Sequence, residues 1–471
     1  MKKVTLSALA AVMLSGVAYA DTMSLYSDPK TGQVFTTAGE GRVAMGDFID
    51  AKSIDVNQRE SESAFSEYKD AQKKYVNVKS KAKTLEFSGT HYFGLTSNNY
   101  GATNAQGGDN SVGFEMRRNY VQAKAFFNDK DYFRVTLDST KELESTSTAV
   151  GDGPASVIVK YAYLYLDKIL PYTGVEIGIA HRPWIDYEEH NSWYYRSINK
   201  VILEDKFGTT GVDTMNSADL GINFQTKTPY FSSELGIFNG EGYHSKSNQK
   251  NNDGLSAEWR LTGHVMGNGE KVGKYDIEKE TYLNLSFAGL SSQNHTMSDT
   301  SLAANATPAA AQTVDAASRF NRNAMWVHAV YNQPEFLIAA QYDISKDQYA
   351  GRDTTTLNKN REIKSWSVNG EYRPIQDWTV LARFDSAKVN YPDNTVATAT
   401  NPNNLNVGDT TQWIYGVAYK YNKNVKFIAS GKTVNAEDGT LATTYNGVAN
   451  DTTTGTQADK QSWMLTTEVE W

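Results

Sequence analysis

The connections between strand-like segments alternate between short and long, from about residue 84 to the end of the chain. The short connections lie at 128–131, 227–230, 332–335 and 422–424. The long connections between them are polar and include 96–111, 240–254, 291–319 and 433–460. A soluble β-sandwich has no reason to sort its connections in this way, whereas a membrane barrel has tight turns on one side and large loops on the other. We therefore predict an all-β fold, a transmembrane up-and-down antiparallel β-barrel with short periplasmic turns and long extracellular loops.

Side chains in the last segment of the chain alternate as a barrel strand requires. One face carries Trp463, Leu465 and Val469, and the other carries Glu468 and Glu470. Because a strand has a period of two, the apolar face can meet lipid while the charged face points inward. The chain ends on an aromatic residue, which suits a membrane interface. An ordinary amphipathic edge strand shows the same alternation, so the prediction depends on the rhythm of the connections as well.

We count about sixteen strands, which assigns residues 84–471 to the barrel. An even number is typical of a closed bacterial barrel, and closure is needed because an unpaired strand edge cannot lie in hydrocarbon. The link at 266–279 is long for a periplasmic turn. The strands are centred on 87–93, 118–127, 132–138, 157–166, 175–182, 219–226, 231–238, 257–265, 282–288, 325–331, 337–343, 365–372, 379–384, 414–421, 426–432 and 463–471.

Residues 1–20 have the pattern of a secretory signal peptide. Lys2 and Lys3 precede a mostly apolar run, and Ala18-Tyr19-Ala20 is a small-x-small cleavage site. Residues 21–83 then form a polar, charged segment that we predict to be periplasmic, with a turn at 39–42 and a helix within 64–75. Its aromatic residues recur at heptad-like spacing, which is a weak signal for a coiled coil. The segment could instead be a solvated helix, a disordered leader or a plug.

Composition excludes several classes of protein. After the signal peptide there is no apolar run of about eighteen residues, so we expect no transmembrane helix. The chain has no cysteine, and its pI near 5.5 argues against nucleic acid as a partner. Residues 267–274 resemble a phosphate-binding loop but fail its spacing, so we interpret them as a turn. With no metal-ligand spacing and no nucleophile motif, we predict no cofactor, no metal and no enzyme activity.

The alternation also predicts which charged residues face inward. Phe133, Val135 and Leu137 face lipid on one strand, which turns Arg134 inward, and Val380, Ala382 and Phe384 do the same for Arg383. A charge on the lipid face near the midplane costs about 2–4 kcal/mol, so these charges belong in the lumen. A barrel of sixteen strands is too wide for side chains to fill, so an aqueous channel is expected unless a plug occupies it. The predicted pore-lining residues are Arg118, Lys124, Arg134, Glu176, Arg182 and Arg383.

The third long loop, at about 184–217, differs from the others because it carries many large apolar residues. A solvated loop does not need residues such as Trp193, Tyr195 and Leu203. We therefore predict that this loop folds into the barrel and narrows the pore. The alternative is a compact external loop that packs on its neighbours. The charged residues predicted to lie at the constriction are Asp186, Glu188, Glu189, Arg196 and Lys200.

Several stretches resemble a known family. Residues 33–42, QVFTTAGEGR, are similar to the mature N-terminal region of epsilonproteobacterial major porins. Residues 114–120, 128–138 and 160–166 resemble the early strands of porins related to phosphate-selective porins O and P. This resemblance implies a trimeric, sixteen-stranded outer-membrane porin. In that family, phosphate selectivity depends on a pore lined densely by arginine and lysine. This sequence departs from that pattern, because the acidic residues Asp138, Glu176 and Asp385 are also predicted to face the lumen.

The sequence therefore predicts a passive diffusion porin in the bacterial outer membrane, selective by size and biased toward anions. Its partners would be the lipid bilayer, small hydrophilic solutes and ions, and two further copies in a homotrimer. A surface adhesin or antigen built on a barrel remains an alternative, and loop deletion with retained conductance would reveal it. A barrel hydrolase and a secreted soluble β protein are further alternatives, distinguished by a hydrolysis assay and by purification without detergent.

Overall fold

The structure is a computed structural model in which two units are described separately. It describes residues 22–31, 33–49, 81–100, 111–140, 156–205, 212, 214–240, 242–243, 254–296, 319–349, 360–391, 405–436 and 460–471. Unit 1 is Met1–Lys81 and unit 2 is Ala82–Trp471. The predicted signal peptide and the predicted helix within 64–75 lie outside the described residues.

Unit 1 contains a small antiparallel sheet that the sequence reading did not predict. Its strands are β1 (Thr22–Ser27), β2 (Val34–Phe35) and β3 (Val43–Ile49), in the order β2-β1-β3. The expected turn at 39–42 lies between β2 and β3, where the Arg42 amide donates to the Gly39 carbonyl at 3.1 Å. The Arg42 guanidinium lies 3.5 Å from the centre of the Phe35 ring. These strands escaped detection because they are short and carry no clear alternation.

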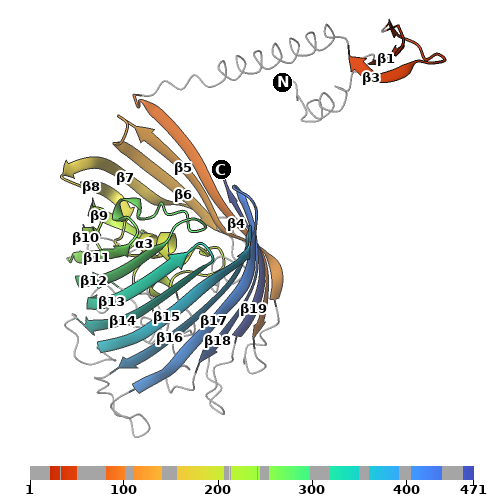
Figure 1. Ribbon diagram of the computed structural model, residues 1–471. Coiled ribbons are helices and arrows are strands. Elements are labelled where there is room, and N and C mark those ends of the chain that lie inside the picture. Colours follow the sequence, from red (N-terminus) through yellow and green to blue (C-terminus); the bar gives the residue numbers. More distant parts are fainter. Residues whose placement is uncertain are drawn as a thin grey trace, which may run out of the picture. The chain divides into compact units, whose positions relative to one another are not determined.

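Unit 2 is a closed barrel in which sixteen strands pair antiparallel with their neighbours in sequence (Figure 1). The last strand pairs with the first, from Lys460 opposite Tyr100 to Glu470 opposite Thr90, which closes the wall. Each of the sixteen predicted strands is present. They are β4 (Thr84–Tyr100), β5 (Ser111–Phe126), β6 (Tyr132–Thr140), β7 (Ser156–Leu170), β8 (Thr173–His181), β9 (Ala218–Lys227), β10 (Phe231–Phe238), β11 (Ser256–Met266), β12 (Tyr282–Thr296), β13 (Arg319–Gln333), β14 (Phe336–Tyr349), β15 (Asn360–Ile375), β16 (Trp378–Tyr391), β17 (Leu405–Asn422), β18 (Val425–Ala436) and β19 (Lys460–Glu470).

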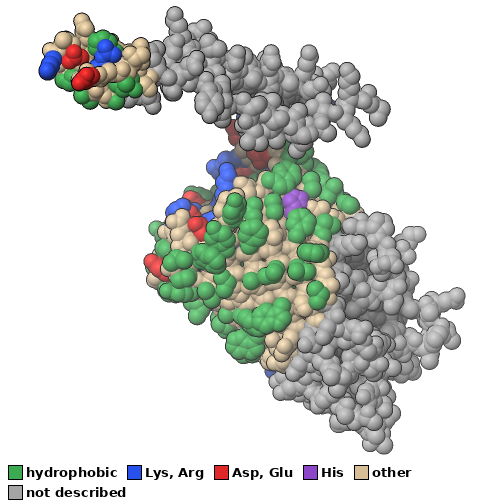
Figure 2. All heavy atoms as spheres, turned by 90° about the vertical axis from the view of Figure 1, so that its right-hand side faces the viewer, with side chains coloured by type: hydrophobic (Ala, Val, Ile, Leu, Met, Phe, Trp, Pro, Cys, Tyr) green, Lys and Arg blue, Asp and Glu red, His purple; other side chains and the backbone are tan. Residues whose placement is uncertain are grey.

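The wall has an apolar exterior and a polar interior, as the alternation predicts. On β6, Phe133 is 40% exposed on the outside, whereas Asp138 is fully buried inside. On β16, Val380 is 47% exposed, whereas Asp385 is fully buried. Figure 2 shows hydrophobic side chains over one outer face of the barrel. Because the strands leave no open edge, all backbone groups in the wall can pair, which is the condition for spanning hydrocarbon.

Aromatic side chains ring the outer wall near the end of the barrel that carries the short turns. They are exposed next to those turns, as at Tyr372, Trp378 and Tyr421. The terminal Trp471 joins them and donates from Nε1 to Nε2 of His91 at 2.7 Å. Amphipathic rings favour the boundary between headgroups and acyl chains. This girdle therefore marks one membrane interface.

The short-turn end has one exception. Two-residue turns at 171–172, 334–335, 376–377 and 423–424 join most neighbouring strands there. Residues 267–281, between β11 and β12, form a much longer connection that contains the 3₁₀ turn η3 (Gly269–Lys271). The remaining described helices are α3 (Ile185–Asn191) and the 3₁₀ turn η1 (Ile202–Glu204). Of the helices within the described ranges, none has the length and apolar character needed to cross a membrane.

Candidate functional site

The described residues of the segment between β8 and β9, 182–205, 212 and 214–217, lie inside the barrel, and we call them the lumen loop (Figure 1). Its backbone carbonyls accept hydrogen bonds from inward-facing side chains on several strands. Five such bonds are formed, each from a wall side chain to a loop carbonyl: Arg260 Nε donates to Pro183 at 3.1 Å, Tyr282 OH to Asn191 at 2.6 Å, Asn369 Nδ2 to Ser192 at 2.8 Å, Arg383 Nη1 to Lys200 at 2.7 Å and Arg322 Nη1 to Thr214 at 2.7 Å. These donors come from β11, β12, β15, β16 and β13, so the lumen loop crosses the interior instead of standing above the rim.

Apolar side chains hold the lumen loop against the inner wall. Trp184, Ile202 and Leu203 are fully buried and belong to one cluster with wall residues such as Trp326 and Ile414. Burying a side chain of this size stabilises the fold by roughly 1.5–3 kcal/mol. This explains why the loop carries large apolar residues that a solvated loop would not need.

The charged residues of the lumen loop fall into two groups. Arg196 is buried and pairs with Glu204 at 2.6 Å and with Glu189. Lys200 lies 3.7 Å from the same Glu204. Asp186 and His190, by contrast, have half-exposed side chains and lie 3.4 Å apart on α3. Arg196, Glu189 and Glu204 fix the shape of the loop, whereas Asp186, His190 and the Lys200 side chain are accessible to solvent.

The environment of α3 shifts three pKa values. Burial raises the pKa of Glu188 to about 8, although Trp184 Nε1 donates to its carboxylate at 2.7 Å. Asp186 raises the pKa of His190 above its usual 6.5. Partial burial would raise the pKa of Asp186, but the facing Arg134, together with His190 and His181 when they are protonated, outweighs it and lowers the pKa of Asp186. On α3, Asp186 is therefore the accessible carboxylate and Glu189 is paired with Arg196, whereas Glu188 holds its proton near neutral pH.

The wall formed by β5 to β8 presents cations and tyrosines to the lumen. The Arg134 guanidinium lies 4.5 Å from the centre of the Tyr161 ring and donates to Tyr163 OH at 3.2 Å. Lys160 donates from Nζ to Tyr120 OH at 2.7 Å. A β-bulge between β6 and β7 turns both Lys160 and Tyr161 inward, although they are neighbours in sequence.

Three of the six predicted pore-lining residues are engaged in close ion pairs, and a fourth, Glu176, is hydrogen-bonded to His181. Arg118 pairs with Asp138 at 2.9 Å, Arg182 with Glu258 at 2.9 Å, Arg383 with Asp385 at 2.8 Å and Glu176 with His181 at 3.0 Å. The other two, Lys124 and Arg134, are only partly buried. All six face inward, but their contribution to permeation stays a prediction, as does the role of the lumen loop as a constriction.

Sequence reasoning missed several inward-facing groups. Lys160 was hidden because the bulge shifts the alternation within one strand. Arg260, which pairs with Glu234 at 2.8 Å, and Arg322, which pairs with Asp347 at 2.6 Å, follow the ordinary alternation. The flanking apolar residues, Leu261 beside Arg260 for example, could have revealed them.

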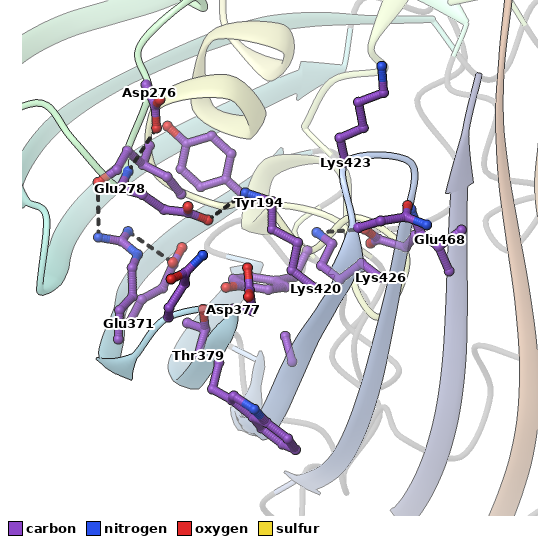
Figure 3. A pocket seen from close by; sticks show the side chains of 18 of the residues that line it. Tyr194, Asp276, Glu278, Glu371, Asp377, Thr379, Lys420, Lys423, Lys426 and Glu468 are labelled. Carbon is purple, nitrogen blue, oxygen red and sulfur yellow. Dashed lines mark hydrogen bonds and ion pairs between the residues drawn. The ribbon is translucent and has the colours of Figure 1, made fainter. Parts of the chain in front are cut away.

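A cavity of about 740 Å³ opens at the short-turn end of the lumen (Figure 3). The lumen loop contributes Tyr194 and Tyr195 to its lining, and the 267–281 connection contributes residues 275–279. The rest of the lining comes from Pro334 in the turn between β13 and β14 and from β15 to β19 with their turns, with basic and acidic side chains such as Lys420, Lys426 and Glu468. The arrangement can admit hydrated ions and polar solutes. Across the described residues, no cluster of His, Asp and Glu could hold a metal ion.

Comparison with known proteins identifies the fold. No protein-family model matches the chain, and no curated protein matches it. Similar solved structures include the anion-selective porin from Comamonas acidovorans, with 10% identity over 82% of this chain and 99% of the porin and a TM-score of 0.52. OmpF of Salmonella typhi has 11% identity over 84% and 99%, with a TM-score of 0.49. The outer membrane channel DcaP of Acinetobacter baumannii has 11% identity over 82% and 97%, with a TM-score of 0.48. The likeness to the Comamonas porin shows a shared outer-membrane β-barrel fold.

Proposed function

We propose that this protein is a porin of the bacterial outer membrane, through which ions and small hydrophilic solutes diffuse passively. The observation that carries the proposal is the lumen loop, which inward-facing side chains of β11, β13 and β16 hold across the interior of a closed barrel. An apolar exterior and a charged interior fit a lipid environment outside and water inside. Transport of this kind needs no covalent chemistry.

The lumen loop would act as a constriction that sets the size limit. Asp186, His190 and Lys200 are solvent-accessible residues of this loop, and a carboxylate oxygen of Asp186 lies 3.6 Å from Nε2 of His181, the last residue of β8. Acidic and basic side chains that line a narrow passage create a local field that orients polar solutes. The partly exposed cations Lys124 and Arg134 would favour anions. The finer resemblance to epsilonproteobacterial and phosphate-selective porins stays part of this proposal.

In a homotrimer, neighbouring copies would cover the part of the wall that has the shortest strands. Strands β8, β9 and β10 contain 9, 10 and 8 residues, whereas β15 contains 16. At about 3.3 Å per residue and a tilt near 40°, the short strands rise only about 20–25 Å, which barely matches the apolar band of a barrel. Packing this wall against a second copy would remove the mismatch with lipid. Ile237, exposed on β10, is suited to that contact.

Recording from planar bilayers under a salt gradient tests the proposed function. Purified protein in detergent should insert and give stepwise currents, with a reversal potential on the anion-selective side. A barrel that inserts but passes no current would reject the channel. The trimer is tested separately by cross-linking in mild detergent, where Ile237→Arg should shift the product from trimer to monomer.

A further inference from the structure

The 267–281 connection, which we call the strap, does not stay at the rim between β11 and β12. It contacts inward-facing side chains on strands further along the wall. Asn332 on β13 donates from Nδ2 to the Ile277 carbonyl at 3.1 Å, and Arg373 on β15 donates to the same carbonyl at 3.2 Å. Glu278 forms an ion pair of 2.8 Å with Lys420 on β17 (Figure 3). The strap therefore reaches across the short-turn end of the lumen from β11 and β12 to β17.

Internal contacts give the strap a defined shape. Tyr275 stacks on Tyr282 with ring centres 4.3 Å apart and donates to the Asn268 carbonyl at 2.8 Å. Gly267 has φ +92°, a conformation that other residues rarely adopt. A Cβ on Gly269 would lie 2.2 Å from the Thr228 carbonyl oxygen, so that position needs glycine for its close approach to the neighbouring turn. The glycine-rich residues 267–274 thus serve a tight backbone path.

The strap and the lumen loop pack against each other. Val272 of the strap is buried in the same apolar cluster as the loop residues Trp184 and Leu203. Tyr194 of the loop lies 3.1 Å from Tyr282 through their hydroxyls and packs in a cluster with Ile277. Both segments line the 740 Å³ cavity, which is bounded on its other side by β15 to β19. A solute that has passed the lumen loop at this side would enter that cavity, with the strap beside it.

We propose that the strap forms a second constriction, at the short-turn mouth of the pore, and that the Glu278–Lys420 ion pair holds it across the opening. This inference rests on the proposed channel function and adds a second filter in series with the lumen loop. The filter would act on ions and small charged solutes, because the cavity beside the strap is lined by carboxylates and amines, among them Glu278, Lys279 and Lys426. Both members of the ion pair have side chains that are a little over 40% exposed, so they are accessible to solutes and reagents.

Single-cysteine variants test this proposal without background, because the chain contains no cysteine. Glu278→Cys would be reacted, in a planar bilayer, with thiosulfonate reagents that attach a sulfonate or a trimethylammonium group. The bulky group should lower the conductance by about twofold, since it narrows a passage in series with the lumen loop. The sulfonate should also preserve more cation permeability than the trimethylammonium group.

A matched control uses Glu335→Cys. Glu335 carries the same charge in an exposed turn at the same end of the barrel, but it does not line the cavity. Its modification should leave conductance unchanged. Equal effects at Glu278 and Glu335 would overturn the proposal, because they would indicate a general effect of charge at the mouth.

A shortened variant, in which residues 267–281 are replaced by Asn-Gly, gives the complementary measurement. A two-residue turn closes an antiparallel pair, and conductance should rise by about twofold when the strap is gone. Should this variant fail to fold, the cysteine variants decide the question. If a conducting Glu278→Cys protein shows unchanged conductance and selectivity after complete modification, the strap is not a constriction, but the channel function still stands. Absence of current from the unmodified wild-type protein would overturn the channel function and this inference with it.

Discussion

Arg383 on β16 donates from Nη1 to the backbone oxygen of Lys200 at 2.7 Å, and this bond ties the lumen loop to the wall. The same guanidinium binds Asp385 through Nε at 2.8 Å and lies 4.9 Å from the centre of the Trp193 ring. One side chain therefore serves both the ion pairs of the wall and the position of the loop. A change at Arg383 should affect stability and permeation together.

We expect Arg383→Gln to lower the free energy of unfolding by about 3–5 kcal/mol, because Asp385 would stay buried without its cation. Open-channel noise should increase as the loop loses an anchor. Thermal unfolding in detergent and single-channel recording measure the two effects. The double variant Arg383→Met with Asp385→Leu removes both charges and should recover stability while the noise persists. Noise that returns to the wild-type level in the double variant would contradict the anchoring role.

Arg134 and Arg182 should behave differently, although both were predicted to line the pore. Arg134 is partly buried and contacts tyrosines, so Arg134→Gln should reduce anion permeability relative to cations by about twofold with little loss of stability. Arg182 is buried against Glu258, so Arg182→Gln should chiefly destabilise the barrel, by about 3–5 kcal/mol. Reversal potentials and thermal unfolding of the two variants separate these outcomes. An unchanged reversal potential for Arg134→Gln would remove its assigned role.

The wall was predictable from the sequence because each strand position depends on local alternation. Phe133 and Arg134 fall on opposite faces wherever the strand runs regularly, so strand number and orientation followed from a simple pattern. Lys160 and Tyr161 show where this reasoning stops. A bulge places both on the inside, and a bulge depends on pairing with a strand that local sequence does not specify.

Partners across the lumen were not predictable. The approach of Glu278 to Lys420 joins residues 142 positions apart, and that of Arg383 to Lys200 joins residues 183 apart. Such contacts depend on the closed geometry of the barrel and not on local patterns. For the same reason, the sequence marked the lumen loop and the strap as unusual, by apolar content and by length, without giving the path of either. The sequence also did not reveal which arginines form ion pairs within the wall.

His190 should make selectivity depend on pH. Asp186 raises the pKa of His190, and Glu189 adds to the shift while the facing cation Arg134 opposes it. As pH falls through a value above 6.5, His190 gains a positive charge inside the lumen, and anion preference should rise. Reversal potentials measured between pH 5 and pH 9 test this. His190→Gln should flatten the profile in that range, and a wild-type response that persists in the variant would assign it to another group.

Glu188 should make stability fall as pH rises. Its pKa is about 8 in the folded protein, against an ordinary value of 4.5. Below pH 4.5 the carboxyl is protonated in both states, so its shift contributes no penalty. Between pH 4.5 and pH 8 the unfolded chain releases the proton while the folded protein retains it, so folding is progressively disfavoured. Glu188→Gln keeps an oxygen for Trp184 Nε1 and should unfold at a higher temperature than wild type at pH 8, with no difference at pH 4. Parallel profiles for the two proteins would contradict the assignment.

Val121 and Gln122 are neighbours on β5 that face opposite sides of the wall, and together they test where the lipid lies. Val121 is 42% exposed on the outside and pairs with Gly89 on β4 and Leu137 on β6, whereas Gln122 faces inward and donates to Ser88 Oγ at 3.1 Å. Val121→Arg should destabilise the barrel by about 2–4 kcal/mol, because a charge would lie in hydrocarbon. Gln122→Arg adds the same charge to the lumen and should fold, with a shift in reversal potential toward anions. Folding yield into vesicles and salt-gradient recordings measure both. If Val121→Arg inserts as well as Gln122→Arg, the outer face is not in contact with lipid.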